Sequence, residues 1–105
     1  MRKILLGAAA LTMLSGAAMA DTTIELVLKD HKFSLPEIKV KARESFVISL
    51  TNQDAQAEEF DSPALKAEKV VAGKGHGNIR IRALAPGRYP FTGEFFGGKG
   101  VVIAE

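Results

Sequence analysis

The 105-residue chain contains no cysteine and no tryptophan, and its three methionines all lie within the first 20 residues. Without cysteine the protein cannot form a disulfide, a thiolate zinc site, a cysteine nucleophile or an acylated lipoprotein anchor. Internal repeats, linkers and low-complexity tracts are also missing from the sequence. Because domains usually run to about 100–150 residues, these absences leave one small domain without thiol chemistry.

Residues 1–20 have the three-part layout of a secretory signal peptide. Arg2 and Lys3 form a basic start, residues 4–14 are almost wholly apolar, and Ala18-Met19-Ala20 is a small-x-small cleavage signature. The apolar run is shorter than the roughly 20 residues that cross a bilayer, so a transmembrane anchor is not expected. We expect cleavage after Ala20, export, and a mature domain of residues 21–105 with no direct membrane anchor.

Removal of the signal peptide changes the charge of the protein. The full chain has 14 Lys and Arg against 12 Asp and Glu, a formal net charge of +2, and a pI near 9.0. Two of the basic residues belong to the signal peptide, so the 85 mature residues carry 12 charges of each sign. A neutral domain has no overall field that attracts phosphate backbones or anionic lipid, and nucleic acid binding is therefore not expected.

Short runs of alternating apolar and polar residues fill the mature sequence, as is typical of β-strands. In 78–82, for example, Ile79 and Ile81 share one face with a period of two that a helix would not give. We expect strands at 22–28, 37–41, 45–51, 78–82, 88–92 and 100–104, with shorter ones at 59–61 and 68–72. Seven to eight strands separated by Gly, Pro, Asn and Asp turns predict an all-β sandwich or barrel.

Strand parity predicts which connections lie together. If consecutive strands run antiparallel, four connections share one end of the fold: 29–36, 52–58, 73–77 and 93–99. They contain both histidines, His31 and His76, together with Glu58 and Glu94. We therefore expect most residues able to do chemistry at one pole of the domain.

The densest acidic segment of the sequence is Glu58-Glu59-Phe60-Asp61. Glu59 and Asp61 are two residues apart, so in an extended strand they share a face at about 6.6 Å along the chain. Like charges at that distance repel unless a cation or a basic side chain lies between them. With Glu68 and Glu94 they would form a hard-oxygen site suited to iron, manganese or calcium more than to copper(I). The alternative is a solvated acidic edge paired with neighbouring lysines.

His31 and His76 are weaker candidates for metal ligands. His76 lies in the glycine-rich turn 73–77, and lone loop histidines are mostly solvated. The glycines of this turn precede a strand rather than a helix, which argues against a phosphate-binding loop. No serine has a histidine and acid arrangement that indicates a hydrolase. No organic cofactor is expected.

Five segments carry motifs that are shared with a known family: 33–40, 46–54, 57–71, 84–91 and 93–95. Pro-Gly-x-Tyr-x-Phe at 86–91 is common to many cupredoxins, whereas Glu-Phe-Asp-Ser at 59–62, followed by Glu-Lys-Val at 68–70, is more specific. In these motifs the chain resembles the EfeO-type cupredoxin-like domain family, small periplasmic proteins associated with bacterial iron uptake. The resemblance covers nearly the whole mature chain and implies a Greek-key β-sandwich in the bacterial periplasm.

The resemblance also implies partners and a metal. Relatives of this kind look like companions of a periplasmic iron-binding protein and a membrane iron permease, with a proposed role in binding copper or iron and in oxidising ferrous iron before transport. The acidic positions that match are those of the cluster above, Glu59, Asp61, Glu68 and Glu94. An enzyme acting alone is not expected, because no redox cofactor is evident beyond a bound metal.

The chain departs from electron-transfer cupredoxins at every copper ligand. A type 1 copper centre uses two His, a Cys thiolate and a weak axial ligand, often Met. The first histidine position holds Glu58, the cysteine position falls around Gly93, and the last ligand loop, 95–100, offers no nitrogen or sulfur ligand. Phe96 stands where relatives often carry a histidine. A type 1 copper centre is therefore excluded.

Two classes of function remain open. The first is an exported metal-handling accessory protein of a ferrous-iron uptake system, which binds iron or copper through carboxylates. The second is a metal-free structural or protein-interaction module of the same transport assembly. For that module, Phe95 and Phe96 beside three glycines would supply a docking patch.

Overall fold

Alternation of apolar and polar side chains produces strands along the whole part of the chain that the computed structural model describes, residues 22–105. The strands are β1 (Thr22–Lys29), β2 (Lys32–Phe33), β3 (Glu37–Val40), β4 (Phe46–Asn52), β5 (Glu58–Ser62), β6 (Ala67–Val71), β7 (His76–Ile81), β8 (Gly87–Gly93) and β9 (Lys99–Ala104). All eight expected strands are present, and β2 is a ninth. The predicted signal peptide lies outside the described residues, and within these no helix is long and apolar enough to cross a membrane.

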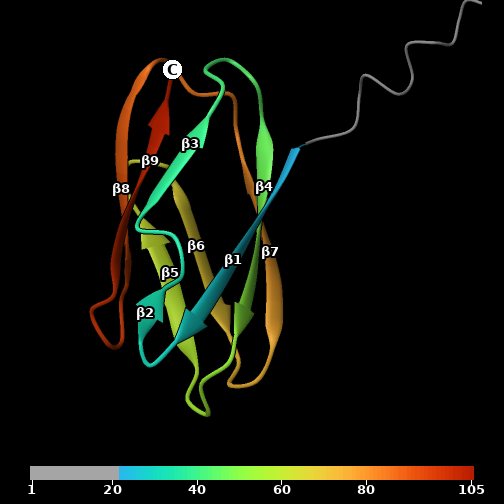
Figure 1. Cartoon of the computed structure of the whole chain (residues 1–105), viewed down its shortest axis with the longest axis vertical. Helices are drawn as coiled ribbons and strands as arrows, with labels where there is room; N and C mark the ends of the chain where they lie inside the picture. Colours follow the sequence, from blue (N-terminus) through green and yellow to red (C-terminus); the bar gives the residue numbers. More distant parts are fainter. Residues whose placement is uncertain (1–21) are drawn as a thin grey trace, which may run out of the picture.

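The strands form two sheets that pack against each other (Figure 1). One sheet has the order β2-β1-β4-β7 and the other the order β3-β9-β8-β5-β6. β1 is parallel to β4, and β3 is parallel to β9, whereas the other described pairs are antiparallel. The arrangement confirms the predicted all-β sandwich.

The core lies between the two sheets and is built from the inward-facing residues of the strands. Leu28 of β1, Ile48 of β4 and Val102 of β9 are completely inaccessible to solvent. The rings of Phe60 and Phe91 stack with their centroids 4.9 Å apart. Each fully buried side chain of this size contributes about 1.5–3 kcal/mol of hydrophobic stabilisation, so the core is the main source of stability.

The β1–β2 turn and the connections 52–58, 73–77 and 93–99 lie at the lower end of the molecule in Figure 1, whereas residues 34–36 rise from that end toward β3. Contacts join these connections directly. The N–H of Asp30 donates to Oδ1 of Asp54 at 2.7 Å, and the N–H of Asn52 donates to the carbonyl oxygen of Gly75 at 2.8 Å. The ring of His31 stacks on that of Phe96, in the fourth connection. The turns of the predicted connections thus meet at one end of the sandwich, which we call the loop pole.

Candidate metal site

Strand β5 presents alternate residues to opposite faces of its sheet. Glu58, Phe60 and Ser62 are buried between the sheets. Glu59 and Asp61 are partly exposed and belong to the outer face. Two of the four predicted metal carboxylates thus share one face, as their spacing predicts.

Glu68 and Glu94 reach the same region from neighbouring segments. Glu68 is directly opposite Asp61 in the β5–β6 ladder. Residues in such positions have Cβ atoms about 4.5–5.5 Å apart, and two like charges there destabilise the sheet. The N–H of Glu94, in the β8–β9 loop, donates to the carbonyl oxygen of Glu59 at 2.8 Å. We call Glu59, Asp61, Glu68 and Glu94 the acidic face.

The pKa of Glu59 is raised above the usual value of 4.5, which shows that the acidic face disfavours a further negative charge. Desolvation is the largest cause, followed by the negative charges of Glu68, Asp61, Glu94 and Glu58. All of these effects penalise the ionised carboxylate, and a bound cation would offset the repulsion. Within residues 22–105, no three Asp, Glu or His side chains are close enough together to hold a metal ion. The acidic face therefore gathers charge without a preformed coordination sphere.

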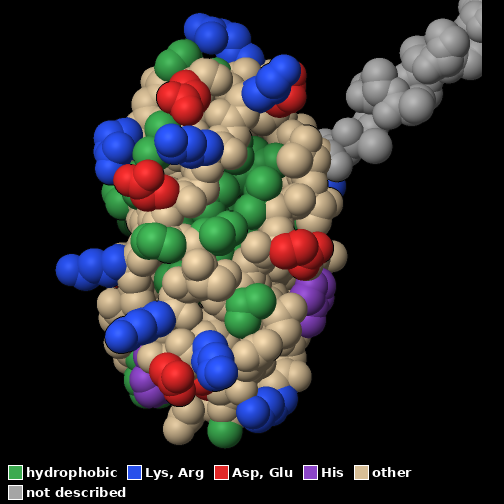
Figure 2. Space-filling model, in the orientation of Figure 1, with side chains coloured by type: hydrophobic (Ala, Val, Ile, Leu, Met, Phe, Trp, Pro, Cys, Tyr) green, Lys and Arg blue, Asp and Glu red, His purple; other side chains and the backbone are tan. Residues whose placement is uncertain are grey.

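The two histidines lie in different places, as the purple patches in Figure 2 show. The ring of His31 stacks on that of Phe96, with centroids 4.0 Å apart and planes 6° from parallel. The Nε2 atom of His76 is 2.6 Å from Oγ of Ser49, and both residues belong to the β4–β7 pair of the other sheet. His76 is thus placed on the opposite sheet from the acidic face.

Asp54 organises the turn that carries His31, a role that the sequence did not reveal. Its carboxylate accepts the N–H of Asp30 at 2.7 Å and that of His31 at 2.9 Å. Both donors have left-handed backbone conformations, with φ of 53° and 64°, which are uncommon for residues other than glycine. The hydrogen bond from His31 is the main cause that lowers the pKa of Asp54 below 3.8, with smaller contributions from the Asp30 N–H and the charges of His31 and Lys74 acting against desolvation.

Glu58 is a fully buried carboxylate with 0% of its surface exposed. Its Oε1 accepts the N–H of Glu59 at 2.8 Å and that of Phe95 at 2.7 Å, and its Oε2 accepts the N–H of Phe96 at 3.2 Å. A buried carboxylate is tolerated when charge-assisted hydrogen bonds of this kind satisfy its oxygens. The alternation of side chains along β5 indicates that Glu58 is buried, because Glu58 lies on the same face of the strand as Phe60.

Residues at the copper positions of the cupredoxin fold do not fit a type 1 centre. Glu58 and Gly93 stand at the first-histidine and cysteine positions that the resemblance assigns. A Cβ atom added to Gly93 would lie 2.6 Å from Oε2 of Glu58 and 2.9 Å from its Cδ, so Glu58 fills the space that a side chain at position 93 would need. The chain also has no cysteine to supply the thiolate.

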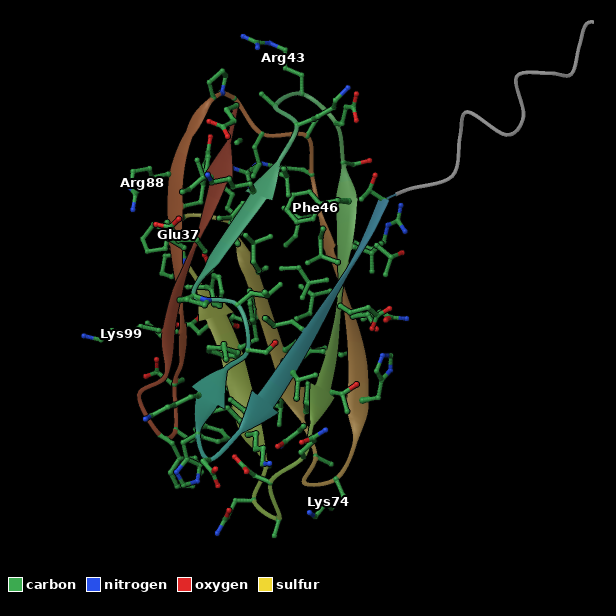
Figure 3. The ribbon with its side chains drawn as sticks, in the orientation of Figure 1. Glu37, Arg43, Phe46, Lys74, Arg88 and Lys99 are labelled. Carbon is green, nitrogen blue, oxygen red and sulfur yellow. The ribbon has the colours of Figure 1, made fainter. Side chains whose placement is uncertain are left out.

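The described hollows lie mainly away from the acidic face. One of about 200 Å³ is formed between β1, β3 and β4 at the end opposite the loop pole, where Phe46 is labelled in Figure 3. Ile24, Val40 and Phe46 line it together with Lys39 and Lys41. A shallower hollow of about 480 Å³ borders the acidic face only at Glu68. Neither hollow brings the four carboxylates together.

The two packed sheets and their strand order define a class, that of all-β sandwiches with a cupredoxin-like fold. Residues 3–104 match the Cupredoxin-like domain family, and the chain belongs to this family. An uncharacterised protein of Rickettsia prowazekii (strain Madrid E) is 33% identical over 72 residues, which cover 69% of this chain and 58% of that protein. The chain therefore spans little more than half the length of that relative.

Solved structures show the same fold at low sequence identity. Auracyanin A, a "blue" copper protein of Chloroflexus aurantiacus, superposes with a TM-score of 0.70 at 19% identity over 82% of this chain and 100% of that one. The metal-binding domain of the Cu(I)-exporting P-type ATPase CopA of Streptococcus pneumoniae D39 has a TM-score of 0.69 at 13% identity over 79% of this chain and 84% of that one. These likenesses establish the cupredoxin-like architecture.

Proposed function

We propose that the protein is an exported metal-handling accessory of a ferrous-iron uptake system, which binds iron or copper(II) through carboxylates and without a type 1 copper centre. The observation that carries the proposal is the acidic face. Asp61 is placed directly opposite Glu68, and Glu94 is tied to the backbone of Glu59. Like charges in directly opposite positions destabilise a sheet, and a bound cation would offset that destabilisation.

The donor atoms decide which metal ions are favoured. Carboxylate oxygens are hard ligands, which suit iron and copper(II) better than copper(I). Among the solved structures of this fold, one is named a copper protein and another is described with Cu(I) bound, which supports metal handling as the general class. In this chain the metal would bind outside the sandwich, on the acidic face. Movement of the carboxylate side chains, which are at least partly exposed, would complete the coordination.

Export and partners form part of the same proposal. The layout of residues 1–20 supports secretion to the periplasm, and the EfeO-type resemblance supports a place beside a periplasmic iron-binding protein and a membrane iron permease. A small domain with an exposed carboxylate site would be accessible to a partner that delivers or receives the metal ion. The protein would act on iron as cargo.

Calorimetric titration of the purified protein with iron(II), without oxygen, and with copper(II) tests the metal role. We expect binding heat from the wild type and its loss in the Glu59→Gln/Asp61→Asn double variant. Glu37→Gln is the matched control, since Glu37 is an exposed glutamate of β3, at the other edge of the same sheet. Equal heats from the wild type and the double variant would refute binding at the acidic face.

A second function, that of an interaction module in the same assembly, is favoured by the aromatic residues of the loop pole. Phe95 is 53% exposed and Phe96 is 44% exposed, although large aromatic side chains are usually buried. For this function we expect Phe96→Ala to weaken association with the iron-binding protein or the permease while metal titrations stay unchanged. Unaltered association would contradict the docking role.

A further inference from the structure

Five consecutive N–H groups, from Gly93 at the end of β8 to Gly97 in the β8–β9 loop, each have an identified acceptor. Those of Gly93 and Gly97 bond within the loop, to the carbonyl oxygens of Gly98 and Gly93, both at 2.7 Å. That of Glu94 bonds to the backbone of β5, as described above. The remaining two, from Phe95 and Phe96, are directed at the carboxylate of Glu58. The loop therefore depends on one buried side chain for two adjacent donors.

The charge and the shape of Glu58 suit it to accept the two loop N–H groups. Its two oxygens accept separate donors of the loop while Oε1 also accepts the N–H of Glu59, so the carboxylate spans strand β5 and the loop. Gly93 leaves the room that the carboxylate needs, because a Cβ there would approach Oε2 to 2.6 Å. The pair Glu58 and Gly93 thus forms a complementary unit in the interior of the loop pole.

We infer that the Glu58 carboxylate is a built-in anionic ligand of the β8–β9 loop, which occupies the interior copper position of the fold and holds the loop closed without metal. A small buried anion and two loop N–H groups replace the link that a metal ion and its ligands would make between β5 and the loop. This inference goes beyond the proposed function, because it concerns the interior of the pole and not the acidic face. The test of this inference does not depend on whether a metal ion binds on the outer surface.

Amide hydrogen exchange followed by NMR tests the inference in Glu58→Gln. The glutamine keeps the size of the side chain, but its NH₂ group cannot accept a hydrogen bond, so one loop N–H loses its partner. A buried hydrogen bond to a charged group contributes roughly 1.5–3 kcal/mol, so we expect exchange at Phe95 or Phe96 to accelerate about 10–100-fold. Amides of the core strand β4 should change much less than those of the loop.

Glu37→Gln is the matched control, since Glu37 is an exposed glutamate of β3, at the other edge of the sheet from β5. Exchange at Phe95 and Phe96 should keep its wild-type rate in this control. Equal rates for these two amides in Glu58→Gln and in the wild type would overturn the inference. The result is independent of whether the protein binds metal.

Chemical rescue provides a second test that uses a free anion. In Glu58→Ala the side chain is removed, and the N–H groups of Glu59, Phe95 and Phe96 lose their acceptor and face a small interior space. Formate should fill that space and raise the thermal midpoint of Glu58→Ala more than equal concentrations of chloride, whereas the wild type should respond equally to both salts. A formate response no larger in the folded variant than in the wild type would contradict an anion-binding position. If Glu58→Ala does not fold, the exchange measurement in Glu58→Gln decides.

Discussion

Three carboxylates at the loop pole are accommodated in three different ways. Glu58 is buried, and three backbone N–H groups compensate its desolvation. Asp54 caps two N–H groups of a turn with left-handed backbone, which lowers its pKa. Glu59 lies among other acids, and its pKa is raised. The chemical role of each residue follows from its hydrogen-bond donors and its neighbours, since all three side chains carry the same functional group.

Asp54→Asn should make the stability of the protein less sensitive to acid. Because the folded-state pKa of Asp54 is lowered, its stabilisation is fully present above the unfolded value near 3.8 and is lost as the pH falls through the folded value. The wild type should therefore have the higher thermal midpoint at neutral pH, and the difference should shrink well below 3.8. Thermal unfolding of both proteins across this range measures the effect. A difference that does not depend on pH would contradict the assigned role.

Glu59→Gln should show the opposite sign. Because the folded-state pKa of Glu59 is raised, ionisation destabilises the fold, and this penalty grows as the pH rises from the unfolded value near 4.5 through the folded value. Without added metal, the variant should unfold at a higher temperature than the wild type at neutral pH and at an equal temperature well below 4.5. Denaturation in the presence of a chelator removes any contribution from bound cations. A lower midpoint for the variant at neutral pH would count against the repulsion.

The elements show how far local patterns determine this structure. All eight strands expected from alternation are present, because a period of two gives each strand one face for the core. β2 has only two residues, Lys32 and Phe33, and so few residues show no period. Its existence depends on the antiparallel pairing of Leu28 with Phe33, a tertiary contact. Parity likewise places Glu58 inside, but two of its three donors come from a loop more than 30 residues further along the chain, which local pattern does not reveal.

Within the β5–β6 ladder, Glu68→Lys should stabilise the protein in the absence of metal. The substitution converts the like-charge pair with Asp61 into an opposite-charge pair, and cross-strand pairs of this kind contribute about 0.2–1 kcal/mol. Chemical denaturation measures the change in the free energy of unfolding. Glu37→Lys on β3 is a suitable control for the change in net charge. The variant should also lose affinity for the metal ion, and a variant of lower stability than the wild type would contradict the pairing.

At the scale of the whole molecule, the sandwich keeps one buried carboxylate apart from a group of exposed carboxylates. Glu58 is buried between the sheets, whereas the acidic face lies on the outside of the sheet that contains β5 and β6. From the sequence, strand direction predicted which connections share the loop pole, and side-chain parity predicted the shared face of Glu59 and Asp61, because both are properties of local pattern. The sequence did not predict how the side chains approach one another across strands, since that depends on register. The absence of cysteine, evident from the sequence, leaves the protein without the thiolate that a type 1 centre needs.

The position of a bound metal ion tests the account most directly. Crystals of the protein grown with iron(II) without oxygen, or with copper(II), can be measured at the absorption edge of the metal, and the anomalous difference density then locates the ion. We predict a peak on the acidic face, within coordinating distance of carboxylate oxygens of Glu59, Asp61 and Glu68, with Glu58 still bonded to the β8–β9 loop. A peak at His31 or His76, a peak in the interior beside Gly93, or no peak at all would contradict the account.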